Sequence, residues 1–116
     1  MAERKNQTPQ AVQSCHELLL WLIPHLDKFP RNRRFTLGER IENGLLMVLE
    51  CLVDACYSRQ KQAALAQANR KLESTRHLWR LAFELQAVNS KSFHHGAKLM
   101  LELGQQIGGW LRYAGK

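Results

Sequence analysis

The sequence predicts an all-α fold, a single domain that forms an antiparallel four-helix bundle of up-down-up-down topology. Four segments carry apolar residues at steps of three and four, the repeat of a helix that buries one face. Short connectors join these segments, and they place neighbouring helices antiparallel. Because 116 residues suffice for one modest hydrophobic core, we expect one domain over residues 1–116, with a flexible segment at residues 1–7.

The first helix is expected to begin at Thr8-Pro9, since a threonine hydroxyl caps helices and proline is tolerated at the first helical position. Pro24 interrupts the apolar stripe of this helix, and we expect a kink there with a last turn that reaches about Lys28. Residues 29–35 then form a short, exposed connector that holds three arginines between two phenylalanines. The stripe consists of Val12, Cys15, Leu18, Leu19, Leu22 and Leu26.

The second helix is expected to start at Thr36. Thr36 and Glu39 have the spacing of a capping box, in which each side chain caps the backbone amide of the other residue. The helix should end at Tyr57 or Ser58, where a polar turn without glycine or proline follows. Its apolar stripe consists of Ile41, Leu45, Val48, Leu49, Leu52 and Cys56.

The third helix is expected over about residues 62–87, and a loop at residues 89–92 with a capping serine leads into the fourth. Three glycines in the fourth helix need a reason, because glycine costs about 1 kcal/mol relative to alanine inside a helix. Either another backbone approaches closely there, or the helix ends near Gly108; the sequence leaves both open. The glycines are Gly104, Gly108 and Gly109.

Charge is distributed unevenly along the chain, whose formal net charge is +7. Residues 1–58 hold seven basic and seven acidic residues, whereas residues 59–116 hold ten and three. A local basic excess favours a polyanionic partner, nucleic acid before membrane, because the basic part lacks the apolar face of an interfacial helix. A solvated basic surface without a partner is the alternative reading of the same pattern.

The basic residues of the third helix form a stripe opposite its apolar seam, at 100° per residue. Such a stripe neutralises phosphates without reading bases, and the connector arginines have the same chemistry. Tryptophans can also stack on bases, although Trp79 lies on the seam and is expected in the core. The candidate nucleic-acid-binding residues are Arg31, Arg33, Arg34, Arg59, Arg70, Arg76 and Arg80.

No membrane helix, leader segment, metal site or cofactor is expected, and the protein is expected in the cytoplasm. The three cysteines are an odd set without CxxC spacing, which favours reduced thiols. Catalysis is not expected either, since Cys15, His16 and Glu17 are consecutive helical residues that point in different directions. Arg70 and His77 have the spacing of helical HEPN ribonucleases and form the enzymatic alternative.

Three segments resemble one family. The stretches WLIPHLDKFPRNRRFTLGERIENGLL, ANRKLESTRHLWRLAFEL and LGQQIGGWLR are similar to segments of the accessory variability determinant (Avd) proteins of diversity-generating retroelements. The resemblance extends from about Leu18 to Arg112. Bundle proteins encoded in ribosomal RNA intervening sequences share the pattern more loosely, and an RNA-binding protein of that type is the second reading.

The resemblance to Avd implies a four-helix protomer within a homopentameric barrel. It also implies a non-catalytic role in mutagenic cDNA synthesis, with the reverse transcriptase and its template-repeat RNA as partners and the cDNA as a further candidate. The residues that match the family motifs and are expected at partner or oligomer contacts are Phe29, Pro30, Gly108, Gly109 and Trp110.

Overall fold

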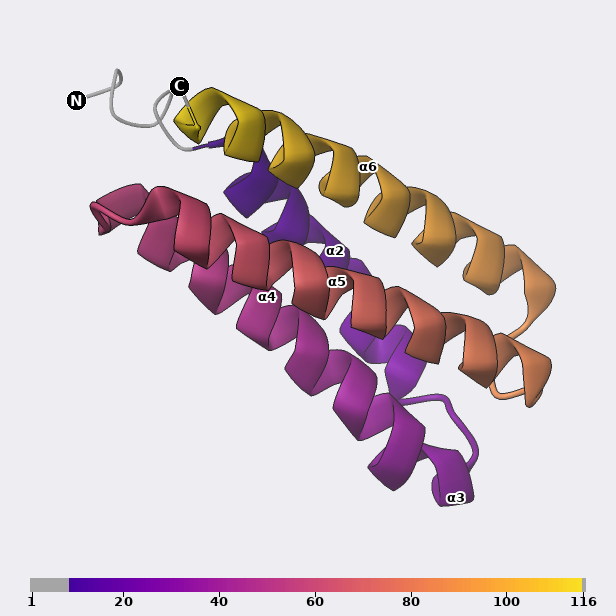
Figure 1. Cartoon of the computed structure of the whole chain (residues 1–116). Coiled ribbons are helices and arrows are strands. Elements are labelled where there is room, and N and C mark those ends of the chain that lie inside the picture. The colour runs from indigo at the N-terminus through magenta and orange to yellow at the C-terminus, as the bar shows by residue number, and fades with distance from the viewer. Residues whose placement is uncertain (1–8, 116) are drawn as a thin grey trace.

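The structure is a computed structural model that describes residues 9–115, and these residues form four long helices and no strand (Figure 1). A short helix, α3 (Arg31–Arg33), and a π-helical turn, η1 (Arg34–Gly38), lie between the first two long helices. None of the helices in this part of the chain is long and apolar enough to cross a membrane. The long helices are α2 (Gln10–Leu26), α4 (Glu39–Tyr57), α5 (Lys61–Glu84) and α6 (Ser90–Ala114).

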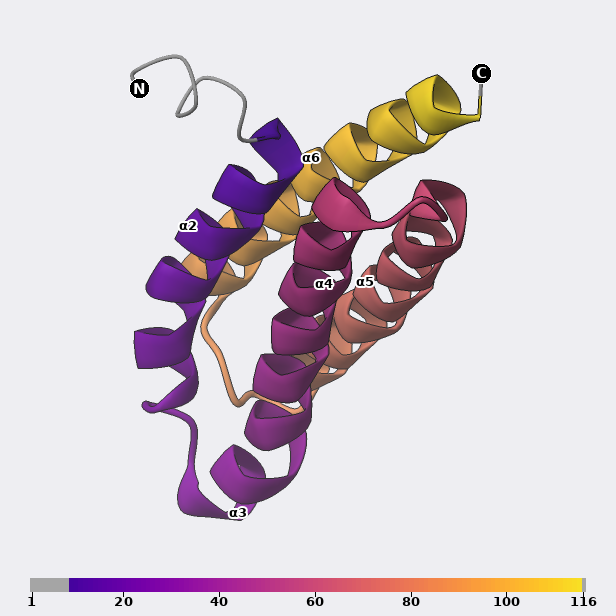
Figure 2. The ribbon, with the colours of Figure 1, turned by 90° about the vertical axis from the view of Figure 1, so that its left-hand side faces the viewer.

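The four long helices form the antiparallel up-down-up-down bundle that the periodicity predicts. Helices α2 and α5 both pack against α4 and α6, so α2 and α5 occupy opposite corners. The α2–α4 connection and the α5–α6 turn lie at one end of the bundle (Figure 2). We call this the connector end. The α4–α5 turn, the start of α2 and the end of α6 lie at the other end.

The core is built from the apolar stripes of all four long helices. The stripe of α2 is buried except for Val12, which packs partly buried against the core. Thr75 is the one polar residue among the buried positions of the described chain, and its hydroxyl donates to the Lys71 carbonyl at 2.8 Å, so its burial costs no unmade hydrogen bond. The largest fully buried side chains are Trp79, Leu18, Leu22, Leu26, Ile41, Leu45, Leu52, Leu65, Leu72, Met100, Leu103 and Ile107.

The expected capping box at Thr36 and Glu39 is wrong, because the chain is already helical before it reaches Thr36. Pro30 precedes α3, and its carbonyl accepts the amides of Arg33 and Arg34. The chain then continues through η1 into α4, whose first turn has no side-chain cap. The Thr36 hydroxyl instead donates to two carbonyls of the preceding turn, at 3.2 and 3.3 Å. The exposed connector is therefore shorter than predicted.

The ends of α2 and α6 also differ from the expected boundaries. Helix α2 continues through Pro24 and ends at Leu26, two residues before the expected end. The start of α6 is capped by Asn89 and not by a serine, since the Asn89 side-chain oxygen accepts the Ser92 amide at 2.8 Å. Thr8 and residues 1–7 lie outside the described residues, so the expected cap at Thr8 and the expected flexible segment stay predictions.

Helix α5 ends at Glu84, three residues before the expected boundary. Gln86 has a positive φ of 66°, the conformation that usually requires glycine after a helix. The amides of Gln86 and Ala87 return to the carbonyls of Phe83 and Ala82, which is the hydrogen-bond pattern of a Schellman motif. Glycine usually marks this position in a sequence, but here it is glutamine, so the sequence did not indicate where α5 ends.

The turn between α4 and α5 is held by side chains. The Lys61 ammonium donates to the Ala55 carbonyl at 2.7 Å, which satisfies an acceptor at the end of α4. The Ser58 hydroxyl accepts the Gln60 amide at 2.8 Å. These two bonds explain how the chain reverses there without glycine or proline.

Two glycines outside the C-terminal group allow the helices to approach closely. A Cβ atom on Gly96 would lie 2.8 Å from Cζ2 of Trp79, and a Cβ atom on Gly44 would collide with the Thr75 hydroxyl. Helix α6 runs past Gly108 to Ala114, so the alternative in which the helix ends near Gly108 is wrong. Around Gly108 and Gly109 a Cβ atom would meet only the Arg112 side chain, and Gly104 leaves room for one.

Replacing Gly96 tests this close approach. We expect Gly96→Ala to lower the free energy of unfolding by about 1–3 kcal/mol, because the rigid Trp79 ring must move away from the new methyl group. The matched Gly104→Ala should leave stability unchanged or raise it by up to about 1 kcal/mol, since alanine favours the helix. Urea unfolding followed by circular dichroism measures both, and equal stabilities would contradict the packing described.

Candidate nucleic-acid interface

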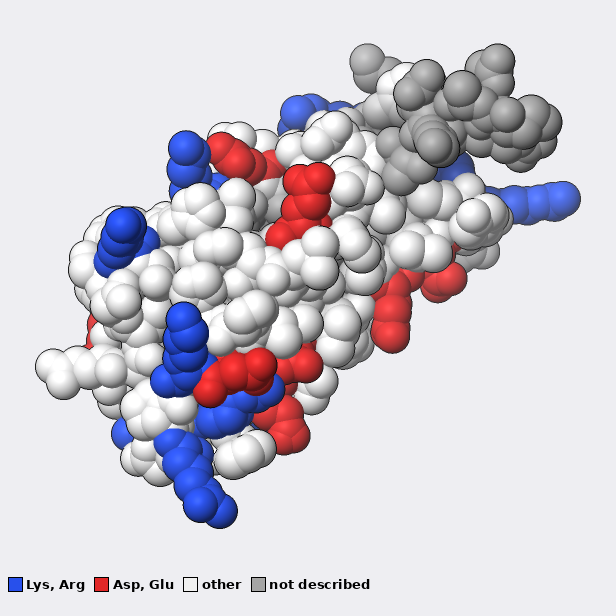
Figure 3. Space-filling view, turned by 180° about the vertical axis from the view of Figure 1, so that it is seen from behind, with Lys and Arg blue, Asp and Glu red and all other residues white. Residues whose placement is uncertain are grey.

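The candidate arginines are spread along the bundle from one end to the other. Those of residues 31–34 lie at the connector end, and Arg76 and Arg80 lie on the part of α5 that runs toward it. Arg70 lies near the middle of α5, and Arg59 lies in the α4–α5 turn at the opposite end, about 36 Å from the connector end along the 24-residue α5. The face around α2 shows charges of both signs scattered over a largely uncharged surface (Figure 3). A continuous basic surface is therefore not found on that face.

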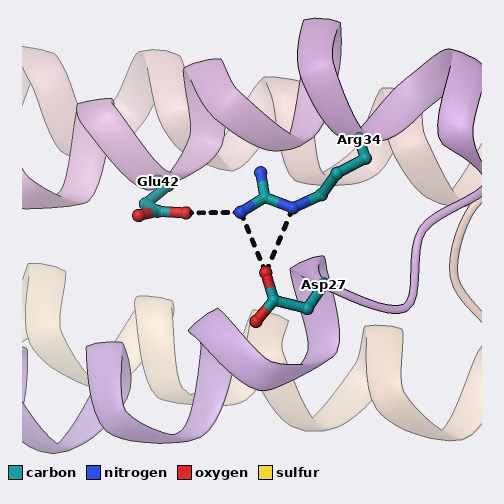
Figure 4. Close-up of polar contacts among 3 residues, drawn as sticks. All are labelled: Asp27, Arg34 and Glu42. Atoms are coloured by element: carbon teal, nitrogen blue, oxygen red, sulfur yellow. Dashed lines mark hydrogen bonds and ion pairs between the residues drawn. The ribbon is translucent and has the colours of Figure 1, made fainter.

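Arg34 is held in place by two carboxylates. Its Nη2 donates to Asp27 Oδ1 at 2.9 Å and to Glu42 Oε1 at 3.1 Å, and its Nε also donates to Asp27 at 3.2 Å (Figure 4). Burial lowers the pKa of the guanidinium, but the hydrogen bonds and charges of both carboxylates outweigh this effect and raise the pKa above its usual value. We call these three residues the Arg34 clamp. It ties the end of α2 to the start of α4, so the role that the structure shows for Arg34 is structural.

Breaking the clamp should destabilise the fold. In Arg34→Met the two carboxylates lose their shared cation, and we expect the free energy of unfolding to fall by about 1–2 kcal/mol. The control is Arg31→Met, which removes an exposed arginine from the same segment. Urea unfolding at low and high salt compares them. A clamp that contributes nothing would make the two variants equally stable at both salt concentrations.

The basic stripe of α5 faces outward, as predicted. Arg70, His77 and Arg80 are exposed, and Arg76 is half-buried. Arg76 bonds to Glu73 at 3.2 Å, and Arg80 bonds to Glu84 at 3.0 Å, each within one helical turn. Exposed pairs of this kind contribute about 0–1 kcal/mol, so both guanidinium groups can turn to a phosphate at small cost.

A groove lies between α5 and α6 next to this stripe. Its volume is about 230 Å³, and side chains of both helices line it. Arg76, His77 and Arg80 contribute from α5, together with Glu73. The α6 contribution, from Phe93, Ala97 and Met100, was not predicted from the sequence. The pairing of α6 with this side of α5 is a tertiary feature, and no local motif marks it.

The tryptophans divide between the core and its edge. Trp79 is buried, as expected, and its Nε1 donates to the Phe93 carbonyl at 3.0 Å. Trp21 is half-buried and stacks on His25 with ring centroids 4.1 Å apart. Trp110 is half-buried and packs against the core from the other end of α6. None of the three is a freely exposed platform for base stacking.

The residues expected at partner contacts do not form one patch. Phe29 is buried and its ring lies parallel to that of Trp79, with centroids 6.4 Å apart, so the expectation that it is exposed is wrong. The connector folds this ring into the core where α2 ends. Pro30 remains exposed beside it. Gly108, Gly109 and Trp110 are half-buried near the opposite end of the bundle.

The candidate catalytic groups are far apart or buried. Arg70 and His77 are exposed on α5 and stand about 10 Å apart along its axis. Burial raises the pKa of the Cys15 thiol to about 12, while its neighbour His16 points to solvent. Among residues 9–115 no group of three histidine, cysteine or acidic side chains is placed to hold a metal ion.

The comparison with protein families matches the whole described bundle. The sequence model of the bAvd-like family covers residues 10–114, from the first residue of α2 to the last residue of α6. The chain belongs to the bAvd-like family. No curated protein matches it. As a bAvd-like protein it is an accessory protein of the retroelement type, from a non-catalytic family, and the resemblance of its three segments to Avd is confirmed.

Proposed function

We propose that this bAvd-like protein binds the template-repeat RNA and the reverse transcriptase of a diversity-generating retroelement and supports mutagenic cDNA synthesis without catalysing it. The observation that carries the proposal is the family match over residues 10–114. The polymerase performs the chemistry, and this protein brings RNA and enzyme together. The cDNA is a further polyanion that the same basic surface suits.

The charge of the second helical hairpin supports RNA binding. The basic excess of the chain lies entirely in residues 59–116, which contain α5 and α6. Exposed arginines on α5 neutralise phosphates and release counterions, which gives affinity that does not depend on sequence. The side that carries α5 and α6 is therefore the RNA-binding side in this proposal.

Removal of two α5 arginines should weaken RNA binding and its salt dependence. We expect Arg76→Ala with Arg80→Ala to lower the slope of log affinity against log salt by about 1.4, since each lost phosphate contact on a single strand removes about 0.7. The control double variant, Lys28→Ala with Arg40→Ala, removes the same charge at exposed positions outside α5. Fluorescence anisotropy with labelled RNA measures both, and identical slopes would place RNA elsewhere.

Self-association into a homopentamer is the second part of the proposal. A closed ring needs two different surfaces that complement each other. Helix α4 holds four acidic residues and one basic residue, whereas α5 holds five basic and two acidic residues. Partly exposed apolar side chains on each long helix offer further contact area, and they include Leu20, Met47, Leu81 and Leu101.

Light scattering tests the pentamer. We expect a mass about five times the 13.4 kDa of one chain at moderate salt. High salt should weaken the assembly, because opposite charges across the contacts are screened. A protein that remains a monomer at micromolar concentration, at low salt as well as high, would exclude the ring.

Binding of the polymerase is tested separately. We expect the purified reverse transcriptase of the same retroelement to co-elute with this protein after nuclease treatment, since RNA then cannot bridge them. A reverse transcriptase from an unrelated retroelement is the control. Co-elution that disappears with the RNA would restrict the protein to an RNA-binding role.

A further inference from the structure

We propose that the groove between α5 and α6 receives an unpaired nucleobase of the bound RNA. The base would lie against Phe93 and Ala97, and the phosphates beside it would contact Arg76 and Arg80. This inference rests on the proposed RNA binding and adds a preference for single-stranded RNA, with one site on each protomer.

The groove is hollow because small residues of α6 face large residues of α5. Gly96 brings the α6 backbone onto the Trp79 ring, where a Cβ atom would lie only 2.8 Å from Cζ2. The next residue, Ala97, lines the groove with a methyl group alone. The space beside it, about 230 Å³, is not filled by a side chain of this protomer.

The apolar wall of the groove is rigid. Trp79 is 1% exposed and is fixed by the hydrogen bond from its Nε1 to the Phe93 carbonyl. The Phe93 ring stacks on Phe83, with centroids 4.3 Å apart and an interplanar angle of 10°. A wall held on both sides does not have to be ordered when a ligand enters, which lowers the entropic cost of binding.

The two sides of the groove differ in chemistry. The α6 side presents Phe93 and Ala97, and the α5 side presents two guanidinium groups and the His77 imidazole. A nucleotide has the matching halves, a flat apolar base and an anionic phosphate. Glu73 also borders the groove, but its bond to Arg76 is solvent-exposed and therefore weak.

Single-stranded RNA fits these features better than duplex RNA. In an A-form duplex the bases are stacked inside, and the deep major groove does not admit side chains. Unpaired bases can turn outward and lie on aromatic side chains. An acidic helix of a protein partner would need a longer apolar strip, because its anchors repeat every three to four residues.

Filling the groove without changing its charge tests the inference. Ala97→Leu extends the α6 wall into the hollow, and the control, Ala63→Leu, adds the same side chain at an exposed position of α5. Affinity is measured by fluorescence anisotropy for a uridine single strand, for the same strand with abasic sites, and for a duplex of equal length. Circular dichroism confirms that both variants fold.

We expect the wild-type protein to bind the intact strand about tenfold more tightly than the abasic strand, the size of effect that base stacking produces. Ala97→Leu should bind both strands with the affinity that the wild type has for the abasic strand, and duplex binding should be unchanged. Ala63→Leu should behave as the wild type. The abasic comparison needs no variant, so a folding defect cannot imitate the result.

Other outcomes separate this inference from the proposed function. Equal wild-type affinities for the intact and abasic strands would overturn it, while a reduced salt slope in Arg76→Ala with Arg80→Ala would still support RNA binding. Loss of reverse transcriptase binding in Ala97→Leu, with RNA affinity retained, would assign the groove to a protein partner and also overturn it. A wild-type protein that binds none of the three RNAs would remove the proposed function as well.

Discussion

The contact between Trp79 and Gly96 sets how closely α5 and α6 approach, and much of the connector end is arranged around it. The Trp79 ring has the rings of Trp21, Phe29 and Phe93 as neighbours, with centroids 6.2 to 6.4 Å away. These neighbours come from α2, from the connector that follows it and from α6. One buried indole thus joins three segments of the chain, and the absence of a Cβ atom on α6 makes room for it.

The two halves of the sequence differ in net charge, and the bundle places them on two different sides of the molecule. Residues 1–58, which balance their charges, form the α2–α4 hairpin, and the basic residues 59–116 form the α5–α6 hairpin. Because the hairpins pack side by side, one side is close to neutral and the other is basic. In the proposed function the second hairpin binds the RNA, while the first keeps the carboxylates that hold the Arg34 clamp.

The apolar periodicity predicted the four long helices and their buried stripes, because burial of one helix face is recorded locally in the chain. The starts and ends were harder to predict. Pro30 begins a helical segment before the apparent cap at Thr36. Gln86 adopts a positive φ, which is unusual for a residue other than glycine. The outward direction of the α5 arginines followed from helix geometry. Helix geometry did not predict the burial of Phe29 or the groove beside Ala97, because each depends on which helix packs against that position.

The π-helical turn η1 sets the rotation of the connector relative to α4. A π turn contains one residue more than an α turn, so residues 34–38 can be regarded as an α-helix with a single insertion. If the same residues formed an ordinary α-helix without the wider turn, everything before them would rotate by about 100° relative to α4. Arg34 would then point away from Asp27 or Glu42, and Phe29 would leave its position beside Trp79. The extra residue of the π turn therefore sets the helical rotation at which Arg34 meets its two carboxylates and Phe29 packs beside Trp79.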